Sequence, residues 1–134
     1  MAERRYRALV VDDEAALRML TVRELSRRGF ECDAAHDGAQ AMELIVSRHY
    51  DVVVTDLRMP GMNGHALAVE LLSRENRPAV VVLTGVTEPR LAKDLIARGV
   101  DDIVFKPVDV GILAAKVRAL VIRRVSQKTA DQLA

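Results

Sequence analysis

Five short apolar runs recur along the chain, each bounded by polar or turn-forming residues. They cover residues 8–11, 31–35, 52–55, 79–83 and 103–105. The runs at 52–54 and 80–83 are continuous and β-branched rather than alternating, which is typical of central parallel strands covered on both faces. We therefore expect five strands, with helices packed over both faces of their sheet.

Between these runs, apolar residues recur three and four positions apart, the spacing of one face of a helix. Gly29 and Gly99 stand where two helices would end, and Asp109 stands where it could cap the last helix. The segment 87–89 supplies a cap residue followed by a first-turn proline. The expected buried stripes are Leu17, Leu20 and Leu25; Ala41, Leu44 and Ile45; Leu67, Leu71 and Leu72; Leu91, Leu95 and Ile96; and Leu113, Val117, Leu120 and Val121.

Strict alternation of strand and helix predicts a three-layer α/β/α sandwich with right-handed crossovers. We expect a doubly wound, flavodoxin-like fold around a five-stranded parallel sheet of order 2-1-3-4-5. One domain would span residues 6–124. The helical pattern fades after Arg124, so residues 125–134 are expected to form a polar tail or the start of a linker.

Composition narrows the function classes. The 134 residues carry a net charge of only +1, and 3% are aromatic, which argues against direct binding of nucleic acid. The single cysteine, Cys32, rules out an internal disulfide framework and fits a reducing compartment. No apolar stretch approaches the roughly 20 residues of a membrane helix, so we expect a cytoplasmic protein without membrane contact. The isolated His36, His49 and His65 are expected to be surface or cap residues.

Reactive side chains follow four of the five expected strands. Asp12 and Asp13 follow the first strand, Asp56 the third, Thr84 the fourth and Lys106 the fifth. The carboxyl ends of parallel strands share one edge, and ligands bind there at the point where strand order reverses. In the order 2-1-3-4-5, the first and third strands are neighbours at that point. These five side chains are therefore expected to converge.

Three carboxylates in one cleft require a compensating cation. At a separation of about 4 Å and an effective dielectric of about 20, each pair costs about 4 kcal/mol. Hard oxygen ligands with room for water suit Mg²⁺, and Lys106 adds positive charge. This setting favours phosphoryl transfer with Asp56 as the nucleophile. Each residue alone could be a helix cap or loop residue, but the full set in this order makes coincidence improbable.

Four segments carry a resemblance to a known family: residues 10–14, 54–64, 83–85 and the pair Lys106-Pro107. Over residues 6 to 124 the chain resembles the receiver domains of bacterial two-component response regulators (CheY-like). The resemblance implies that Asp56 accepts phosphoryl from a sensor histidine kinase or a histidine phosphotransfer protein to control an unknown downstream effector. Such a switch is not an enzyme, because it catalyses only its own phosphorylation and dephosphorylation.

The same resemblance implies roles for the neighbouring residues. Asp13, Asp56 and the carbonyl of Arg58 would bind Mg²⁺ directly, and Asp12 through water. Thr84 and Lys106 would move onto the acyl phosphate. The Lys106-Pro107 peptide bond would be cis.

Two departures bear on activation. Ile103 stands three residues before the lysine, where many receivers have an aromatic switch residue, and Gly85 follows Thr84 where alanine is common. Activation is therefore expected to use backbone rearrangement, read out on the fourth helix, fifth strand and fifth helix, which also form a candidate homodimer surface. The side chains of Arg58 and Val86 are expected to screen the acyl phosphate from water. Met59 and Met62 are interpreted as packing residues of the loop after Asp56.

Partner choice is expected to lie on the first helix. Exposed positions among Arg18, Thr21, Val22 and Leu25 could dock a kinase helix, although the spacing of Leu25 also fits a core residue.

Two other function classes remain open. A small aspartyl-phosphate hydrolase would need a second Asp two residues after the nucleophile, where this chain has Arg58, and it would turn over phosphomonoesters. A receiver-like interaction module independent of phosphate would take up no phosphoryl group.

Overall fold

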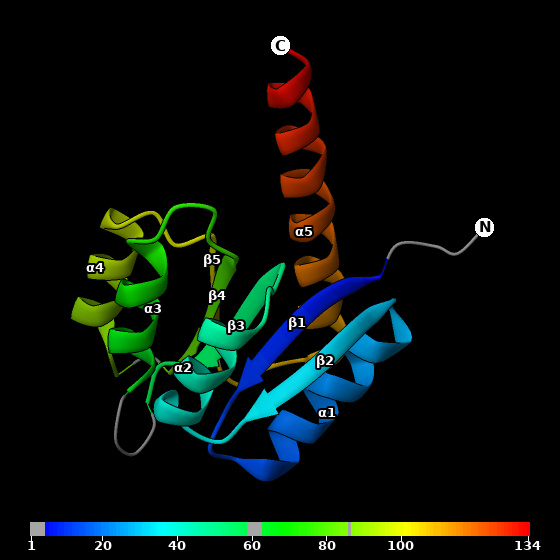
Figure 1. The fold of residues 1–134 in the computed structure, drawn as a ribbon. Helices are drawn as coiled ribbons and strands as arrows, with labels where there is room; N and C mark the ends of the chain where they lie inside the picture. Colours follow the sequence, from blue (N-terminus) through cyan, green and yellow to red (C-terminus); the bar gives the residue numbers. More distant parts are fainter. Residues whose placement is uncertain (1–4, 59–62, 86) are drawn as a thin grey trace.

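A five-stranded parallel sheet forms the centre of the protein. The computed structural model describes residues 5–58, 63–85 and 87–134. The strands are β1 (Tyr6–Val11), β2 (Phe30–Ala35), β3 (Val52–Asp56), β4 (Ala79–Thr84) and β5 (Asp102–Phe105). Their order is β2-β1-β3-β4-β5, as Figure 1 shows. The predicted fold class and strand order are confirmed.

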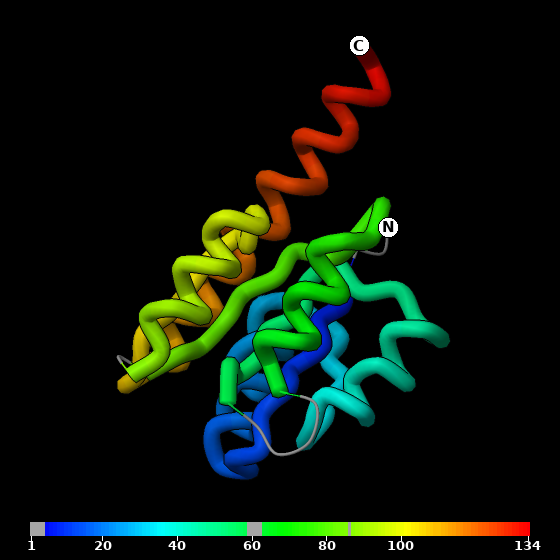
Figure 2. Tube along the Cα trace, turned by 90° about the vertical axis from the view of Figure 1, so that its left-hand side faces the viewer, coloured from blue at the N-terminus to red at the C-terminus, as the bar shows by residue number. Residues whose placement is uncertain are grey.

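Five helices cover the two faces of the sheet. They are α1 (Ala15–Arg27), α2 (Gly38–Ser47), α3 (Gly64–Leu72), α4 (Pro89–Ala97) and α5 (Val110–Leu133). α1 packs against α5 on one face, while α3 contacts both α2 and α4 on the other (Figures 1 and 2). The result is the predicted three-layer sandwich.

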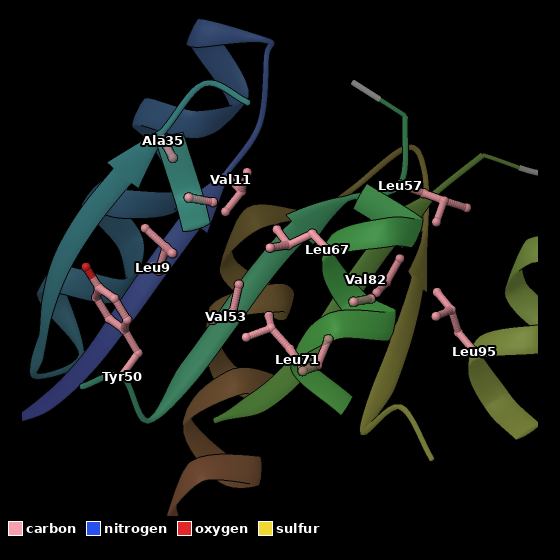
Figure 3. Close-up of a cluster of buried hydrophobic side chains, with 13 residues drawn as sticks. Leu9, Val11, Ala35, Tyr50, Val53, Leu57, Leu67, Leu71, Val82 and Leu95 are labelled. Atoms are coloured by element: carbon pink, nitrogen blue, oxygen red, sulfur yellow. The ribbon is translucent and has the colours of Figure 1, made fainter. Parts of the chain in front are cut away.

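Alternate side chains of each central strand enter two separate cores. Val53 and Val82 point toward α2, α3 and α4, where they meet Leu67, Leu71 and Leu95 (Figure 3). On the other face, the second core combines strand residues with α1 and α5. Its larger members include Val52, Val54, Val81, Leu83, Leu25, Leu113 and Val117. Burial on both faces explains why the central strands read as continuous apolar runs.

Helix boundaries follow the expected signals. Asp109 caps α5 by accepting a hydrogen bond from the backbone N–H of Ile112 at 3.0 Å. Gly29 and Gly99 have φ of 91° and 87° just after α1 and α4, a conformation that glycine adopts without strain. Pro89 begins α4 directly after its N-cap residue, Glu88, whose side chain makes no capping hydrogen bond.

Two residues of the predicted stripes are exposed, which corrects the sequence analysis. Leu20 is 49% exposed and Ile96 is 64% exposed. In α1 the sheet-facing side is instead completed by Thr21, four residues before Leu25 and hence on the same helical face. In α4, Leu95 faces the core, and Ile96, one residue further along the helix, is turned away by about 100°.

The fifth helix is longer than its apolar pattern. Residues 125–134, expected as a tail or linker, continue as helix to Leu133, and residues 126–134 are exposed. This extension projects beyond the sheet (Figures 1 and 2). This segment can be helical without packing on the sheet, because the backbone hydrogen bonds of a helix join residues within the segment and do not require an apolar stripe. Within the described residues, no helix is both long and apolar enough to cross a membrane.

Candidate functional site

The carboxyl ends of the strands meet at one edge of the sheet, as predicted. Asp12, Asp56 and Thr84 are almost fully buried there, whereas Asp13 is exposed. Backbone hydrogen bonds fix this edge: the N–H of Leu57 donates to Leu83 at 2.9 Å, and that of Lys106 donates to Thr84 at 2.8 Å. The positions of the functional side chains therefore follow from the sheet register.

An acidic cluster lies beside this edge. Single carboxylate oxygens of Asp12, Asp13 and Asp56 all lie within 4.8 Å of one another. Burial, together with the charges of Asp56 and Asp13, raises the pKa of Asp12 from 3.8 to about 6, although the N–H of Glu14 and the charge of Lys106 act in the opposite direction. Oxygen ligands gathered at this spacing fit a hard divalent cation. A cation there would offset both the burial of the charged carboxylate and the repulsion from its neighbours, which together raise the pKa of Asp12.

Lys106 supplies positive charge to the cluster. Its Nζ donates to Oδ2 of Asp56 at 2.7 Å. Partial burial of the ammonium lowers its pKa, but the hydrogen bond to Asp56 and the charges of Asp56 and Asp12 outweigh this effect, so the pKa is raised. The peptide bond between Lys106 and Pro107 is cis, as the resemblance implied.

Thr84 lies on the wall of a small hollow next to Asp56. The hollow has a volume of about 190 Å³ and is lined by Asp56, Leu57, Arg58, Thr84, Gly85, Thr87, Glu88 and Lys106. The hydroxyl of Thr84 donates to the carbonyl of Gly85 at 3.1 Å. It is therefore held by the backbone of its own loop, next to the space above Asp56.

Gly64 is a site residue that was named above only within the segment 54–64. A Cβ atom at this position would lie 1.7 Å from the carbonyl oxygen of Asp56. The first turn of α3 thus packs directly on the backbone of the acidic residue, with Asn63 capping the helix by accepting from Ala66 N–H at 2.8 Å. The requirement for glycine is visible only in the folded structure, where α3 contacts the backbone of Asp56.

Arg58 connects two walls of the hollow. Its backbone N–H donates to Oδ1 of Asp56 at 3.3 Å, and its guanidinium forms an ion pair with Glu88. The role of its carbonyl as a metal ligand stays a prediction. Met59, Met62 and Val86, which the sequence analysis also interpreted, lie outside the described residues.

Each of the three histidines lies beside an aspartate that is not a member of the acidic cluster. His65, in the first turn of α3, contacts Asp94 of α4 at 2.7 Å, while His36 and His49 lie beside Asp37 and Asp51 at 3.1 and 3.8 Å.

Cys32 in β2 is a free thiol, half-buried, and burial raises its pKa. Neither it nor the histidines change the character of the site.

The predicted docking positions on α1 are partly wrong. Thr21 is buried and therefore unavailable to a partner, whereas the burial of Leu25 confirms the core alternative that its spacing allowed. The guanidinium of Arg18 donates to the backbone carbonyl of Asp12 at 2.7 Å and thereby ties α1 to the site. The large exposed hydrophobic residues of α1 are instead Met19, 68% exposed, and Leu20.

Comparison with known proteins identifies the family. The model for the response regulator receiver domain matches residues 8–118. The chain therefore belongs to the response regulator receiver domain family, as the fold and site had indicated.

The chain is similar to two curated regulators and to a solved response regulator structure. It is 34% identical over 128 residues to response regulator MprA of Mycobacterium bovis, covering 96% of this chain and 56% of that protein. It is 37% identical over 103 residues to regulatory protein AtoC of Escherichia coli, covering 77% of this chain and 22% of that protein. Response regulator protein TrrA of Thermotoga maritima, solved in complex with Mg(2+)-BeF, superposes with a TM-score of 0.74 at 34% identity, covering 86% of this chain and 98% of TrrA. The chain thus spans 56% of the length of MprA and 22% of the length of AtoC.

Proposed function

We propose that the protein is a phosphorylation-dependent switch in which Asp56 accepts a phosphoryl group. The observation that carries this proposal is the arrangement at Asp56: a nearly buried carboxylate that accepts from Lys106 at 2.7 Å and lies within 4.8 Å of two further carboxylates. The family of the chain supports the same function.

The proposed phosphoryl transfer uses Asp56 as one of the residues that line the hollow. An oxygen of Asp56 attacks the phosphorus of a phosphohistidine, the P–N bond breaks, and its electron pair returns to the imidazole. The ammonium of Lys106 and the hydroxyl of Thr84 line the same hollow and can donate to the phosphoryl oxygens. The donor would be a sensor histidine kinase or a phosphotransfer protein.

The acidic cluster is proposed to hold Mg²⁺ through Asp12, Asp13, Asp56 and the carbonyl of Arg58. Bound there, Mg²⁺ would offset the carboxylates and the negative charge of the phosphoryl group. The similar protein TrrA was solved with Mg(2+)-BeF, which supports this assignment. The protein would promote only its own phosphorylation and dephosphorylation and would not turn over other substrates.

The output is proposed to lie on α4, β5 and α5. Thr84 and Lys106 border these elements, so movement of either side chain onto a phosphoryl group would strain their connections. Large hydrophobic residues are exposed there: Ile96, Phe105 and Ile112. This surface would bind the effector or a second copy of the chain. Unchanged amide chemical shifts for residues 87–120 under saturating beryllofluoride and Mg²⁺ would contradict this readout.

The direct test of the switch is intact mass after incubation with acetyl phosphate and Mg²⁺. We expect one phosphoryl adduct per chain, absent in Asp56→Asn and in the presence of a chelator. Asp131→Asn, which makes the same change in the exposed end of α5, is the matched control and should be labelled normally. A folded wild-type chain that takes up no phosphoryl group would instead favour an interaction module independent of phosphate.

A further inference from the structure

An ion pair joins Arg58 and Glu88, two of the residues that line the hollow. Arg58 follows β3, two residues after Asp56, and Glu88 is the N-cap residue of α4. Both side chains line the hollow together with Asp56, Thr84 and Lys106. The pair therefore joins the loop that carries the nucleophile to the start of the helix proposed to carry the output.

The pair is weak in the unphosphorylated protein. The Arg58 side chain is 77% exposed, so water screens its attraction to Glu88. Glu88, by contrast, is only 17% exposed and is one of the residues that line the hollow. Its carboxylate pairs with Arg58 and makes no capping hydrogen bond at the N-terminus of α4.

A phosphoryl group on Asp56 reverses the balance of these interactions. It brings up to two negative charges and three acceptor oxygens, to which a guanidinium can donate in bidentate fashion. The same charge repels the carboxylate of Glu88 across a hollow of about 190 Å³. Both effects act in one direction: Arg58 is drawn toward Asp56, and Glu88 is pushed away from it.

We propose that Arg58 exchanges partners when Asp56 is phosphorylated, leaving Glu88 for the phosphoryl group and thereby releasing the N-terminus of α4. The exchange makes Arg58 a phosphoryl-binding residue and Glu88 its competitor. It also gives a charge-driven link between site and helix in a chain that has Ile103 in place of an aromatic switch residue. The proposal rests on the proposed phosphorylation of Asp56.

The test titrates beryllofluoride, with Mg²⁺ in excess, into wild type, Glu88→Gln, Arg58→Gln and the double variant, and follows the amide shifts of residues 87–97. Glu88→Gln frees Arg58, so this variant should bind beryllofluoride about threefold to tenfold more tightly than wild type. Its α4 amide shifts should already lie closer to those of the liganded protein before beryllofluoride is added. Arg58→Gln should bind about tenfold more weakly. In the double variant, Glu88→Gln should recover less affinity than it gains in wild type, because only the direct repulsion between Glu88 and the ligand is then removed. Arg90→Gln, which removes an exposed cation in the same turn of α4, should bind like wild type.

The outcomes separate this proposal from the function on which it rests. Failure of the wild-type chain to bind beryllofluoride in a manner that needs Mg²⁺ and Asp56 would contradict the proposed function itself. Normal wild-type binding together with unchanged affinity in both Arg58→Gln and Glu88→Gln would overturn the partner exchange alone. Equal weakening in Arg90→Gln and Arg58→Gln would also overturn it, because a general loss of positive charge would then explain the effect.

Discussion

Burial of Asp12 makes the acidic cluster costly for the folded chain in the absence of a cation. Asp12 is 1% exposed, and its carboxylate lies near two others. The cluster is therefore a feature that favours function over stability.

Metal-free protein should lose stability as the pH rises through the titration of Asp12. The folded pKa of about 6 lies above the usual 3.8, so between these pH values the folded chain binds more protons than the unfolded chain and its stability falls with rising pH. Asp12→Asn should remove this cost and raise the free energy of unfolding by about 2 kcal/mol at pH 7.5, but by little at pH 4. Urea denaturation with a chelator at both pH values measures it. A gain equal at both values would contradict the burial of an ionised Asp12.

Alanine should be tolerated at Gly85 but not at Gly64. A Cβ at Gly64 would overlap the carbonyl of Asp56, whereas the nearest atom to a Cβ at Gly85 is 3.9 Å away. Gly64→Ala should therefore lower the free energy of unfolding by about 2–3 kcal/mol or more. Gly85→Ala should change it by less than about 1 kcal/mol. Chemical denaturation of the two variants provides the comparison, and similar losses would show that the close approach at Gly64 is not retained in solution.

At the scale of elements, the N-terminal edge of the sheet is held by ion pairs rather than by apolar contacts alone. Asp101, just before β5, accepts from Arg77 at 2.8 Å, from Arg124 of α5 at 3.2 Å and from the N–H of Val80 at 2.8 Å. Arg124 also donates to the carbonyl of Arg77 at 2.8 Å. This network connects α5 to the starts of β4 and β5.

Loss of Asp101 should therefore destabilise the fold markedly. Asp101→Ala leaves two partly buried guanidinium groups and one backbone N–H without their acceptor, which should cost about 2–4 kcal/mol. Glu70→Ala removes an exposed i,i+4 pair with Arg74 and should cost less than about 0.5 kcal/mol. Thermal unfolding of both variants would reveal the difference. Equal effects would show that the network contributes no more than a surface pair.

The elements were more predictable than the contacts between them. Continuous runs such as 52–54 identify central strands because burial on both faces leaves no polar positions. Strand order places Asp12 and Asp56 at one edge, so the candidate cluster also follows from the sequence. Three other features depend on how the helices sit on the sheet. They are the exposure of Leu20 and Ile96, the ion pair between Arg58 and Glu88, and the close approach of Gly64 to Asp56. Local spacing does not determine that placement.

For the whole molecule, the projecting end of α5 is the main departure from a compact sandwich. Residues 126–134 are exposed, while Val125 packs against the second core. The extension buries no core residue. The free energy of unfolding of a chain truncated after Val125 should therefore lie within about 1 kcal/mol of that of the full chain. A large loss of stability in differential scanning calorimetry would show that the domain boundary lies beyond residue 124.

The central claim is that the phosphoryl group resides on Asp56, and reductive trapping tests it most directly. Borohydride converts an aspartyl phosphate to homoserine, and the tryptic peptide 49–58 contains both Asp51 and Asp56. After treatment with acetyl phosphate and Mg²⁺, tandem mass spectrometry should find homoserine at position 56 and aspartate at position 51. Homoserine at another position, or none in protein shown by intact mass to carry a phosphoryl group, would contradict the assignment of Asp56 as the phosphoacceptor.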